Sequence, residues 1–158
     1  MKYKVEDYNE RYYAGVKLPM GIAVEDTDNE EVPQLWGKLI SEVLDKIPNV
    51  SKPNKFIGLE CFDQDFKKTK RFDYFAMVQT ETFLESNEYF VTKKLPKGRY
   101  ISFDILFDEM DEDMNKCHEY IENNDIEVDE GFDFSEYLIG VNYSESNALL
   151  HFTFLLKE

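Results

Sequence analysis

Cysteine and histidine are scarce in this sequence of 158 residues, which has two of each. Cys61 and Cys117 stand far apart and form no ligand motif with His118 or His151. A disulfide framework and a zinc site both need cysteines at closer and more regular spacing. The scattered glycines also form no phosphate-binding loop. The sequence therefore predicts reduced thiols, no metal and no cofactor.

Basic residues and long hydrophobic runs are also in short supply. The chain carries 33 Asp and Glu against 18 Lys and Arg, a formal net charge of −15. This balance argues against direct nucleic-acid binding, because each phosphate contact needs a cation. Charges at Lys2, Lys4, Glu6 and Asp7 interrupt the N-terminus where a signal peptide would be apolar, and no run reaches the length of a membrane helix. We expect a soluble, cytoplasmic protein without membrane contact.

Apolar and aromatic side chains are abundant by contrast. The sequence is 42% hydrophobic and 15% aromatic. Acidic disordered chains are poor in aromatic residues and bury too little surface to offset the entropy of ordering. A chain of this length and composition forms one compact core. We expect a single folded domain over residues 1–158.

Hydrophobic periodicity predicts the same order of elements in both halves. Apolar positions at helical spacing predict a helix over 32–47, and a weaker pattern predicts another over 111–123. Runs rich in aromatic and β-branched residues predict strands. These strands are 11–16, 55–62 and 71–80 in the first half and 99–107, 132–139 and 148–156 in the second.

This order is β-α-β-β twice, which indicates an internal duplication with halves of about 1–82 and 88–158. The fold class predicted is α+β, with an antiparallel sheet, helices packed on it and pseudo-two-fold symmetry. Two such units side by side leave a groove between them, and grooves of this kind are common ligand sites.

Five segments in this frame resemble the GyrI-like small-molecule-binding domain, the effector-binding module of bacterial multidrug-responsive transcription regulators. They are VPQLWGKL at 32–39, FIGLE at 56–60, FDYFA at 72–76, LPKGRYISF at 95–103 and FSEY at 134–137. The resemblance implies a concave pocket, lined by aromatics and an acid, that accepts lipophilic and often cationic molecules. The two repeats use the whole chain and leave no helix-turn-helix, so we expect the stand-alone form.

The acidic residue of the pocket is where the sequence departs from that family. The family's acid falls two positions before the tyrosine, which here is Ser135, and Glu136 is one position later. In a strand, that shift places the Glu136 carboxylate on the opposite face unless a bulge restores it. Glu60 shares a face with Phe56, Gly58 and Phe62 and is the other candidate. The predicted ligand-binding residues are Trp36, Glu60, Tyr74, Phe75, Tyr100, Phe103, Glu136 and Tyr137.

Three functions fit these residues, and binding without catalysis is the reading we favour. The first is a protein that binds or sequesters a lipophilic, cationic small molecule. The second is a hydrolase of reactive electrophiles, in which Glu60 or Glu136 activates water and Tyr137 hydrogen-bonds the leaving group. The third is an acidic protein that binds a protein partner such as a DNA-processing enzyme through its charge. The sequence makes no prediction of the oligomeric state.

Overall fold

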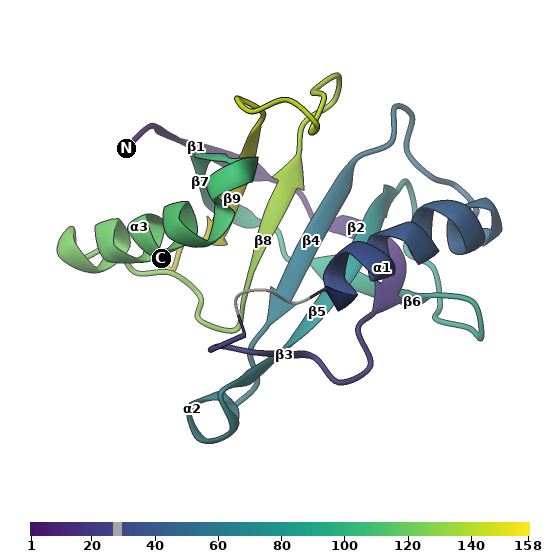
Figure 1. The fold of residues 1–158 in the computed structure, drawn as a ribbon, viewed down its shortest axis with the longest axis horizontal. Coiled ribbons are helices and arrows are strands. Elements are labelled where there is room, and N and C mark those ends of the chain that lie inside the picture. Colours follow the sequence, from purple (N-terminus) through teal and green to yellow (C-terminus); the bar gives the residue numbers. More distant parts are fainter. Residues whose placement is uncertain (27–29) are drawn as a thin grey trace.

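The computed structural model describes residues 1–26 and 30–158, which form a curved antiparallel sheet with helices on one side (Figure 1). Helix α1 (Glu31–Lys38) continues as a π-helical turn (Leu39–Val43) and a 3₁₀ turn (Leu44–Lys46). The other helices are α2 (Phe66–Thr69) and α3 (Met110–Asn123), the latter preceded by a 3₁₀ turn (Phe107–Glu109). The strands are β1 (Tyr3–Tyr8), β2 (Arg11–Lys17), β3 (Ile22–Ala23), β4 (Phe56–Cys61), β5 (Arg71–Thr80), β6 (Val91–Leu95), β7 (Gly98–Leu106), β8 (Phe132–Tyr137) and β9 (Leu149–Leu155).

The order of strands in the sheet displays the duplication. The order is β1-β7-β9-β8-β4-β5-β2-β6, with β3 paired to β5 at the side. Each half contributes its three repeat strands in mirrored order, β7-β9-β8 and β4-β5-β2, and the halves meet where β8 pairs with β4. The predicted α+β class and the repeated β-α-β-β order are confirmed.

Two edge strands were absent from the sequence-based prediction. Strand β1 precedes β2 in the chain but pairs with β7 of the other half. Strand β6 likewise precedes β7 but pairs with β2. The two halves therefore exchange their first strands across the molecule, which ties them into one sheet.

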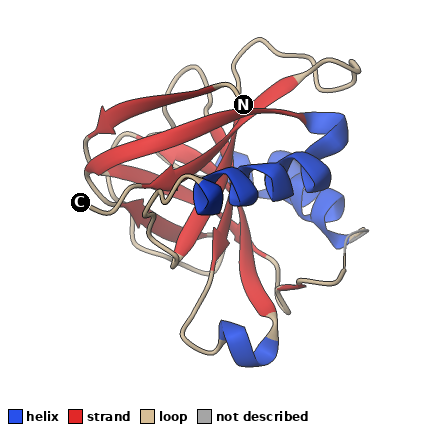
Figure 2. Cartoon of the chain, turned by 90° about the vertical axis from the view of Figure 1, so that its left-hand side faces the viewer, coloured by secondary structure: helices blue, strands red, loops and turns tan. Residues whose placement is uncertain are grey.

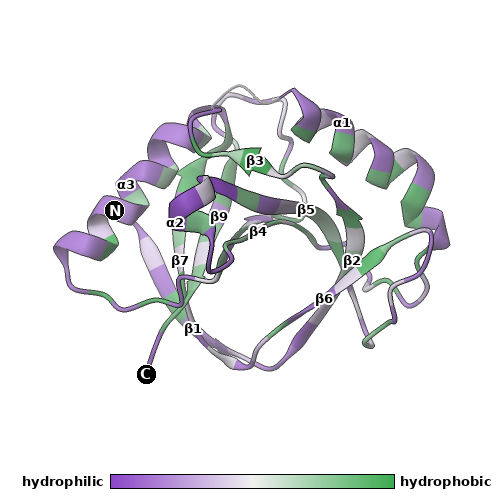
Figure 3. Cartoon of the chain, turned by 90° about the horizontal axis from the view of Figure 1, so that it is seen from below, coloured by the Kyte–Doolittle hydropathy of each residue, from purple (hydrophilic) through white to green (hydrophobic). Residues whose placement is uncertain are grey.

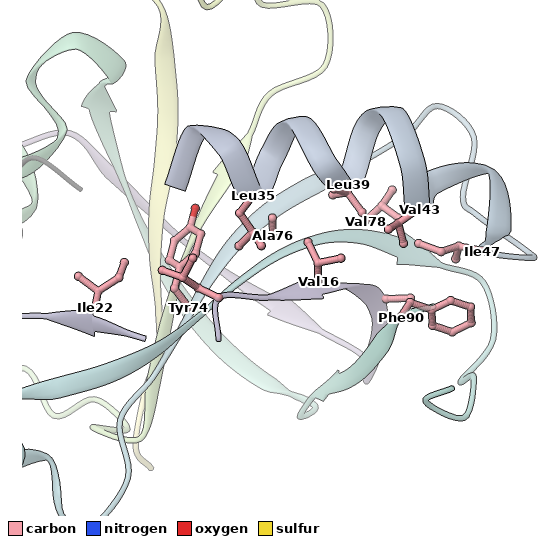
Figure 4. Packing of buried hydrophobic residues seen from close by; sticks show 12 residues of the cluster. Val16, Ile22, Leu35, Leu39, Val43, Ile47, Tyr74, Ala76, Val78 and Phe90 are labelled. Carbon is pink, nitrogen blue, oxygen red and sulfur yellow. The ribbon is translucent and has the colours of Figure 1, made fainter. Parts of the chain in front are cut away.

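Both long helices lie on the same side of the sheet, over its two ends (Figures 2 and 3). The apolar stripe of the first helical segment points down onto β2 and β5, as Figure 4 shows. Residues buried in this contact are Leu35, Leu39, Val43 and Ile47 from the helical segment and Val16, Ala76 and Val78 from the strands. Helix α3 buries Cys117 and Ile121 against Phe103 and Phe152 on β7 and β9. The central strands β4 and β8 run between the two helices (Figure 1).

The face of the sheet turned away from the helices carries a second set of buried side chains. Alternation along β4 turns Ile57 and Leu59 to this face, and Gly58 and Glu60 to the helix side. The other residues buried here include Tyr13, Phe75, Met77, Tyr100 and Phe134. Strands β1 and β6 curl beneath this face (Figure 3).

No helix in the described part of the chain is both long enough and apolar enough to cross a membrane. Cys61 and Cys117 are free thiols, the first half-buried and the second buried. Among the described residues, no group of three or more His, Cys, Asp or Glu side chains is placed to hold a metal ion.

Candidate functional site

A cavity of about 1500 Å³ lies between α1 and α3, over the central strands. Its floor is formed by residues on the helix-facing side of β4 and β8: Gly58, Glu60, Asp133, Ser135 and Tyr137. Trp36 and Ile40 line it from the first helical segment, and Met110, Met114 and His118 from α3. The groove predicted between the two halves is present.

Aromatic side chains fix the wall of the cavity on the α1 side. Trp36 Nε1 donates a hydrogen bond of 2.9 Å to the Tyr74 hydroxyl. The Trp36 ring also meets Tyr137 edge-on with 5.2 Å between centroids, and Phe56 with 6.1 Å. Such edge-to-face packing holds flat rings in defined positions while leaving apolar area for a ligand.

Gly58 makes the position of Tyr74 possible. A Cβ atom at Gly58 would stand 2.6 Å from the Tyr74 hydroxyl oxygen and 3.2 Å from Cζ. The Tyr74 side chain therefore crosses the strand where β4 has no side chain. The glycine in the segment FIGLE is thus explained by close approach and not by backbone conformation.

Carboxylates dominate the charge of the cavity. Among the described residues, its lining includes one lysine, Lys67, and seven acids: Asp26, Glu60, Asp63, Asp111, Asp129, Glu130 and Asp133. Neither Glu60 nor Asp133 forms an ion pair with any described residue. A site with this balance attracts cations and repels anions.

Glu60 and Asp133 are cross-strand neighbours on the floor. They are directly opposite each other in the β4–β8 register, and both face the cavity. Asp133 is only 3% exposed, and within the described part of the chain its buried Oδ1 has no hydrogen-bond partner. Glu60 is half-buried.

Each of the two acids shifts the pKa of the other. Burial raises the pKa of Glu60, and hydrogen bonding with Asp133 opposes that rise. Burial also raises the pKa of Asp133 well above its usual range, and the charge of Glu60 raises it further. Like charges a few ångströms apart in a poorly hydrated site resist joint ionisation. Asp133 is therefore the member that keeps its proton to higher pH.

The structure brings four of the eight predicted site residues to the cavity: Trp36, Glu60, Tyr74 and Tyr137. The other four are not among the described residues that line it. Phe75 and Tyr100 belong to the core on the opposite face of the sheet, and Phe103 is fully buried beneath α3. Expecting these three in the groove was wrong, because alternation along β5 and β7 turns Phe75 and Tyr100 to the face away from the helices, and α3 covers Phe103 on the helix side.

Glu136 points away from the cavity, as its one-residue shift from Ser135 implies. Its carboxylate lies 4.0 Å from Arg11 Nη1 and 3.8 Å from His151 Nδ1. Burial acts to raise the pKa of Glu136, but hydrogen bonding with His151 and the charge of Arg11 outweigh it and the pKa is lowered. Glu136 lines a separate cavity of about 280 Å³ and does not contribute to the large one.

Sequence reasoning missed most polar residues of the cavity, among them Asp133 and His118. Asp133 lies two positions before Ser135, so alternation alone places it on the same face. His118 on α3 also borders the cavity, edge-on to Phe152 and Phe154 at 5.6 and 5.3 Å, and burial lowers its pKa.

Comparison with known proteins gives one family. The family model described as Cass2, integron-associated effector binding protein, matches residues 3–151. No curated protein matches the chain at a significant level. The matched span contains the first repeat, most of the second, and every residue that lines the cavity except Phe152 and Phe154.

Solved structures of low sequence identity share the fold. The structure of SAV2435 bound to tetraphenylphosphonium has a TM-score of 0.76 at 14% identity, covering 99% of this chain and 94% of that one. The integron cassette protein VCH_CASS2 from Vibrio cholerae has a TM-score of 0.67 at 19% identity, covering 98% and 95%.

The C-terminal domain of EcmrR, a protein also solved in complex with DNA, has a TM-score of 0.68 at 12% identity, covering 99% and 98%. A hydrolase from Listeria innocua is more distant, with a TM-score of 0.57 at 12% identity, covering 99% and 92%. At these identities the similarity concerns the fold alone.

Proposed function

This chain belongs to the family of integron-associated effector-binding proteins, and on that premise we propose that its groove binds lipophilic organic cations. The observation that carries the proposal is the acid pair on the floor, Glu60 and Asp133, which lines an apolar cavity and has no cationic partner among the described residues. A buried carboxylate without a counter-ion is costly, and a bound cation would remove that cost. SAV2435, with the same fold, was solved with such a cation, tetraphenylphosphonium.

The rest of the lining suits the apolar part of such a ligand. The rings of Trp36, Tyr74 and Tyr137 offer π faces, and a cation over an aromatic face gains about 0.5 to 2 kcal/mol depending on its desolvation. Met110 and Met114 on the opposite wall are flexible side chains that adapt to ligands of different shape. Charge then selects the ligand class, and the adaptable walls permit several members of it.

Titration with tetraphenylphosphonium tests the proposal. Trp36 is the only tryptophan and borders the cavity, so its fluorescence reports on the site. We expect saturable quenching by tetraphenylphosphonium and weaker binding of triphenylphosphine oxide, a neutral molecule with the same phenyl groups. The absence of any saturable response would contradict the proposal.

A matched set of variants tests whether binding depends on the acid pair Glu60 and Asp133. The double variant Glu60→Gln/Asp133→Asn removes both charges from the floor, and we expect it to weaken tetraphenylphosphonium binding by about tenfold or more, which corresponds to about 1.4 kcal/mol. The control Glu136→Gln makes the same chemical change on the opposite face and should alter the affinity by less than about twofold. The reverse ranking would place the ligand elsewhere.

Hydrolysis of a small molecule is the second candidate function, favoured by the raised pKa of Glu60 in a cavity it shares with Tyr137. A carboxyl group with a raised pKa can transfer protons near neutral pH. The proposed trio of Glu60, Glu136 and Tyr137 is reduced to Glu60 and Tyr137, because Glu136 faces away. Turnover of an epoxide that is abolished in Glu60→Gln but kept in Glu136→Gln would support this function over binding alone.

A further inference from the structure

We propose that Glu60 and Asp133 hold one proton between them while the groove is free, and release it to solvent when a lipophilic cation binds. The inference rests on the proposed function and adds a property to the same site. It makes Asp133, buried beside Glu60, a second determinant of ligand affinity. Cation affinity then depends on pH.

The geometry of the pair is the first support. Residues directly opposite on one face of an antiparallel sheet have Cβ atoms about 4.5 to 5.5 Å apart. Glu60 and Asp133 occupy such a register pair, and the cavity is the open side of both. Two carboxylates at this separation, away from bulk water, are held most easily with a single negative charge.

The surroundings of Asp133 are the second support. The residue is 3% exposed and lines the cavity, yet in the part of the chain that the structure describes its Oδ1 atom has no hydrogen-bond partner. A polar atom buried without a partner is rare and needs a cause. An incoming cation gives this oxygen an electrostatic partner that the free protein does not supply.

Other titratable groups line the same cavity and contribute to a pH dependence: Asp26, Asp63, Lys67, Tyr74, Asp111, His118, Asp129, Glu130 and Tyr137. Cys61, next to Glu60 on β4, packs on the opposite face and would affect Asp133 only through a thiolate charge. Burial raises the pKa of Tyr137 to about 12, that of Tyr74 well above its usual value, and that of the Cys61 thiol. These three groups stay neutral near pH 7. His118 is the group that must be separated by experiment, because its own proton would also oppose a cation.

Cation binding should displace the shared proton for a general reason. A positive charge within about 4 to 6 Å of a carboxyl group lowers its pKa by about one to three. The same linkage requires that tetraphenylphosphonium affinity rise with pH, by up to about tenfold per pH unit wherever one full proton is released. Both acids are then ionised around the ligand.

The proton count can be measured by calorimetry. Tetraphenylphosphonium is titrated into the protein at several values between about pH 5 and about pH 9, in pairs of buffers with different ionisation enthalpies. The wild type should reach close to one proton released per ligand within this range. Asp133→Asn leaves one acid beside a neutral amide, so release should fall below about 0.2 protons per ligand around pH 7. Glu60→Gln removes the charge that raises the pKa of Asp133 beyond the effect of burial, so proton release should shift to lower pH and decrease at about pH 8. This variant serves as the test if Asp133→Asn does not fold.

His118→Asn is the control for the histidine and should leave the release at about pH 7.5 and above unchanged. The proposal is overturned if tetraphenylphosphonium binds the wild type without proton release across the range, or if Asp133→Asn releases as many protons as the wild type. Either result leaves the proposed function intact. A failure of tetraphenylphosphonium to bind at every pH overturns the proposed function itself.

Discussion

Replacement of Gly58 by alanine tests how the aromatic wall is built. The added methyl group would stand 2.6 Å from the Tyr74 hydroxyl oxygen, closer than Cβ contacts occur in proteins. Tyr74 is 9% exposed and its hydroxyl accepts the Trp36 hydrogen bond, so the ring has little room to move without losing that bond. The substitution therefore perturbs both the floor of the cavity and its aromatic wall.

The expected loss of folding stability in Gly58→Ala follows from these two effects. Overpacking in a buried region costs about 1 to 3 kcal/mol, and loss of the Trp36–Tyr74 hydrogen bond adds about 1 kcal/mol. The total of about 2 to 4 kcal/mol corresponds to a decrease in Tm of about 5 to 15 °C for a domain of this size. Thermal unfolding followed by circular dichroism measures the change in Tm. Trp36 fluorescence reports the lost hydrogen bond in the folded protein.

Two further variants show whether contact with Tyr74 is the cause. In Gly58→Ala/Tyr74→Phe, the nearest neighbour of the methyl becomes the ring carbon Cζ at 3.2 Å, so more than half of the decrease in Tm should be recovered. Gly37→Ala is the matched control, since a Cβ there meets nothing within 4 Å, and it should stabilise α1 by about 0.5 to 1 kcal/mol. A Tm of Gly58→Ala within about 1 °C of the wild type would refute the close approach of Tyr74 to β4.

Three other substitutions probe the acid pair and the opposite face. Asp133→Asn should have a higher Tm than the wild type at pH 8, by about 2 to 6 °C. The raised pKa of Asp133 makes the stability of the wild type fall as pH rises above about 4, and the variant lacks this carboxyl group. A difference in Tm that does not shrink toward pH 4 would contradict this. Arg11→Met removes a buried guanidinium that lies 3.8 Å from the Tyr8 ring centroid and pairs with Glu136, and urea unfolding should show a loss of about 2 to 4 kcal/mol. Tetraphenylphosphonium affinity should stay within about twofold in that variant. Phe103→Leu should cost about 1 to 3 kcal/mol in the same assay and also leave the affinity unchanged, because Phe103 is fully buried beneath α3.

Local sequence patterns predicted the first helical segment and the central strands. The 3.6-residue spacing from Val32 to Ile47 describes a helical segment that packs on one side, and runs rich in aromatic and β-branched residues predict β4 and β8. Strands β1 and β6 escaped prediction because they carry charged residues and their partners lie in the other half of the chain. An edge strand held by long-range pairing leaves little periodicity in its own sequence.

The candidate site was likewise predicted where the signal is local in the sequence and missed where it depends on distant parts of the chain. The face of Glu60 followed from its alternation with Phe56, Gly58 and Phe62, all of which line the cavity. Its partner could not be found in this way, because the pairing with Asp133 depends on register between strands more than 70 positions apart. Lateral position in the sheet is equally non-local, which is why Phe103 shares the helix face of the sheet yet lies under α3.

The departure at Ser135 has a structural counterpart in Asp133. The family resemblance places an acid at position 135, on the helix face of β8, and this chain has a serine there that still lines the cavity. Asp133 occupies the same face two residues earlier, which is a displacement of about 7 Å along the strand. Glu60 on β4 faces it across the strand pair, so the negative charge stays on the floor but moves away from Tyr137 toward Phe62 and Phe132. A cation held by this pair would lie nearer the start of β8 than one held at position 135, and so farther from the end of the strand that carries Tyr137.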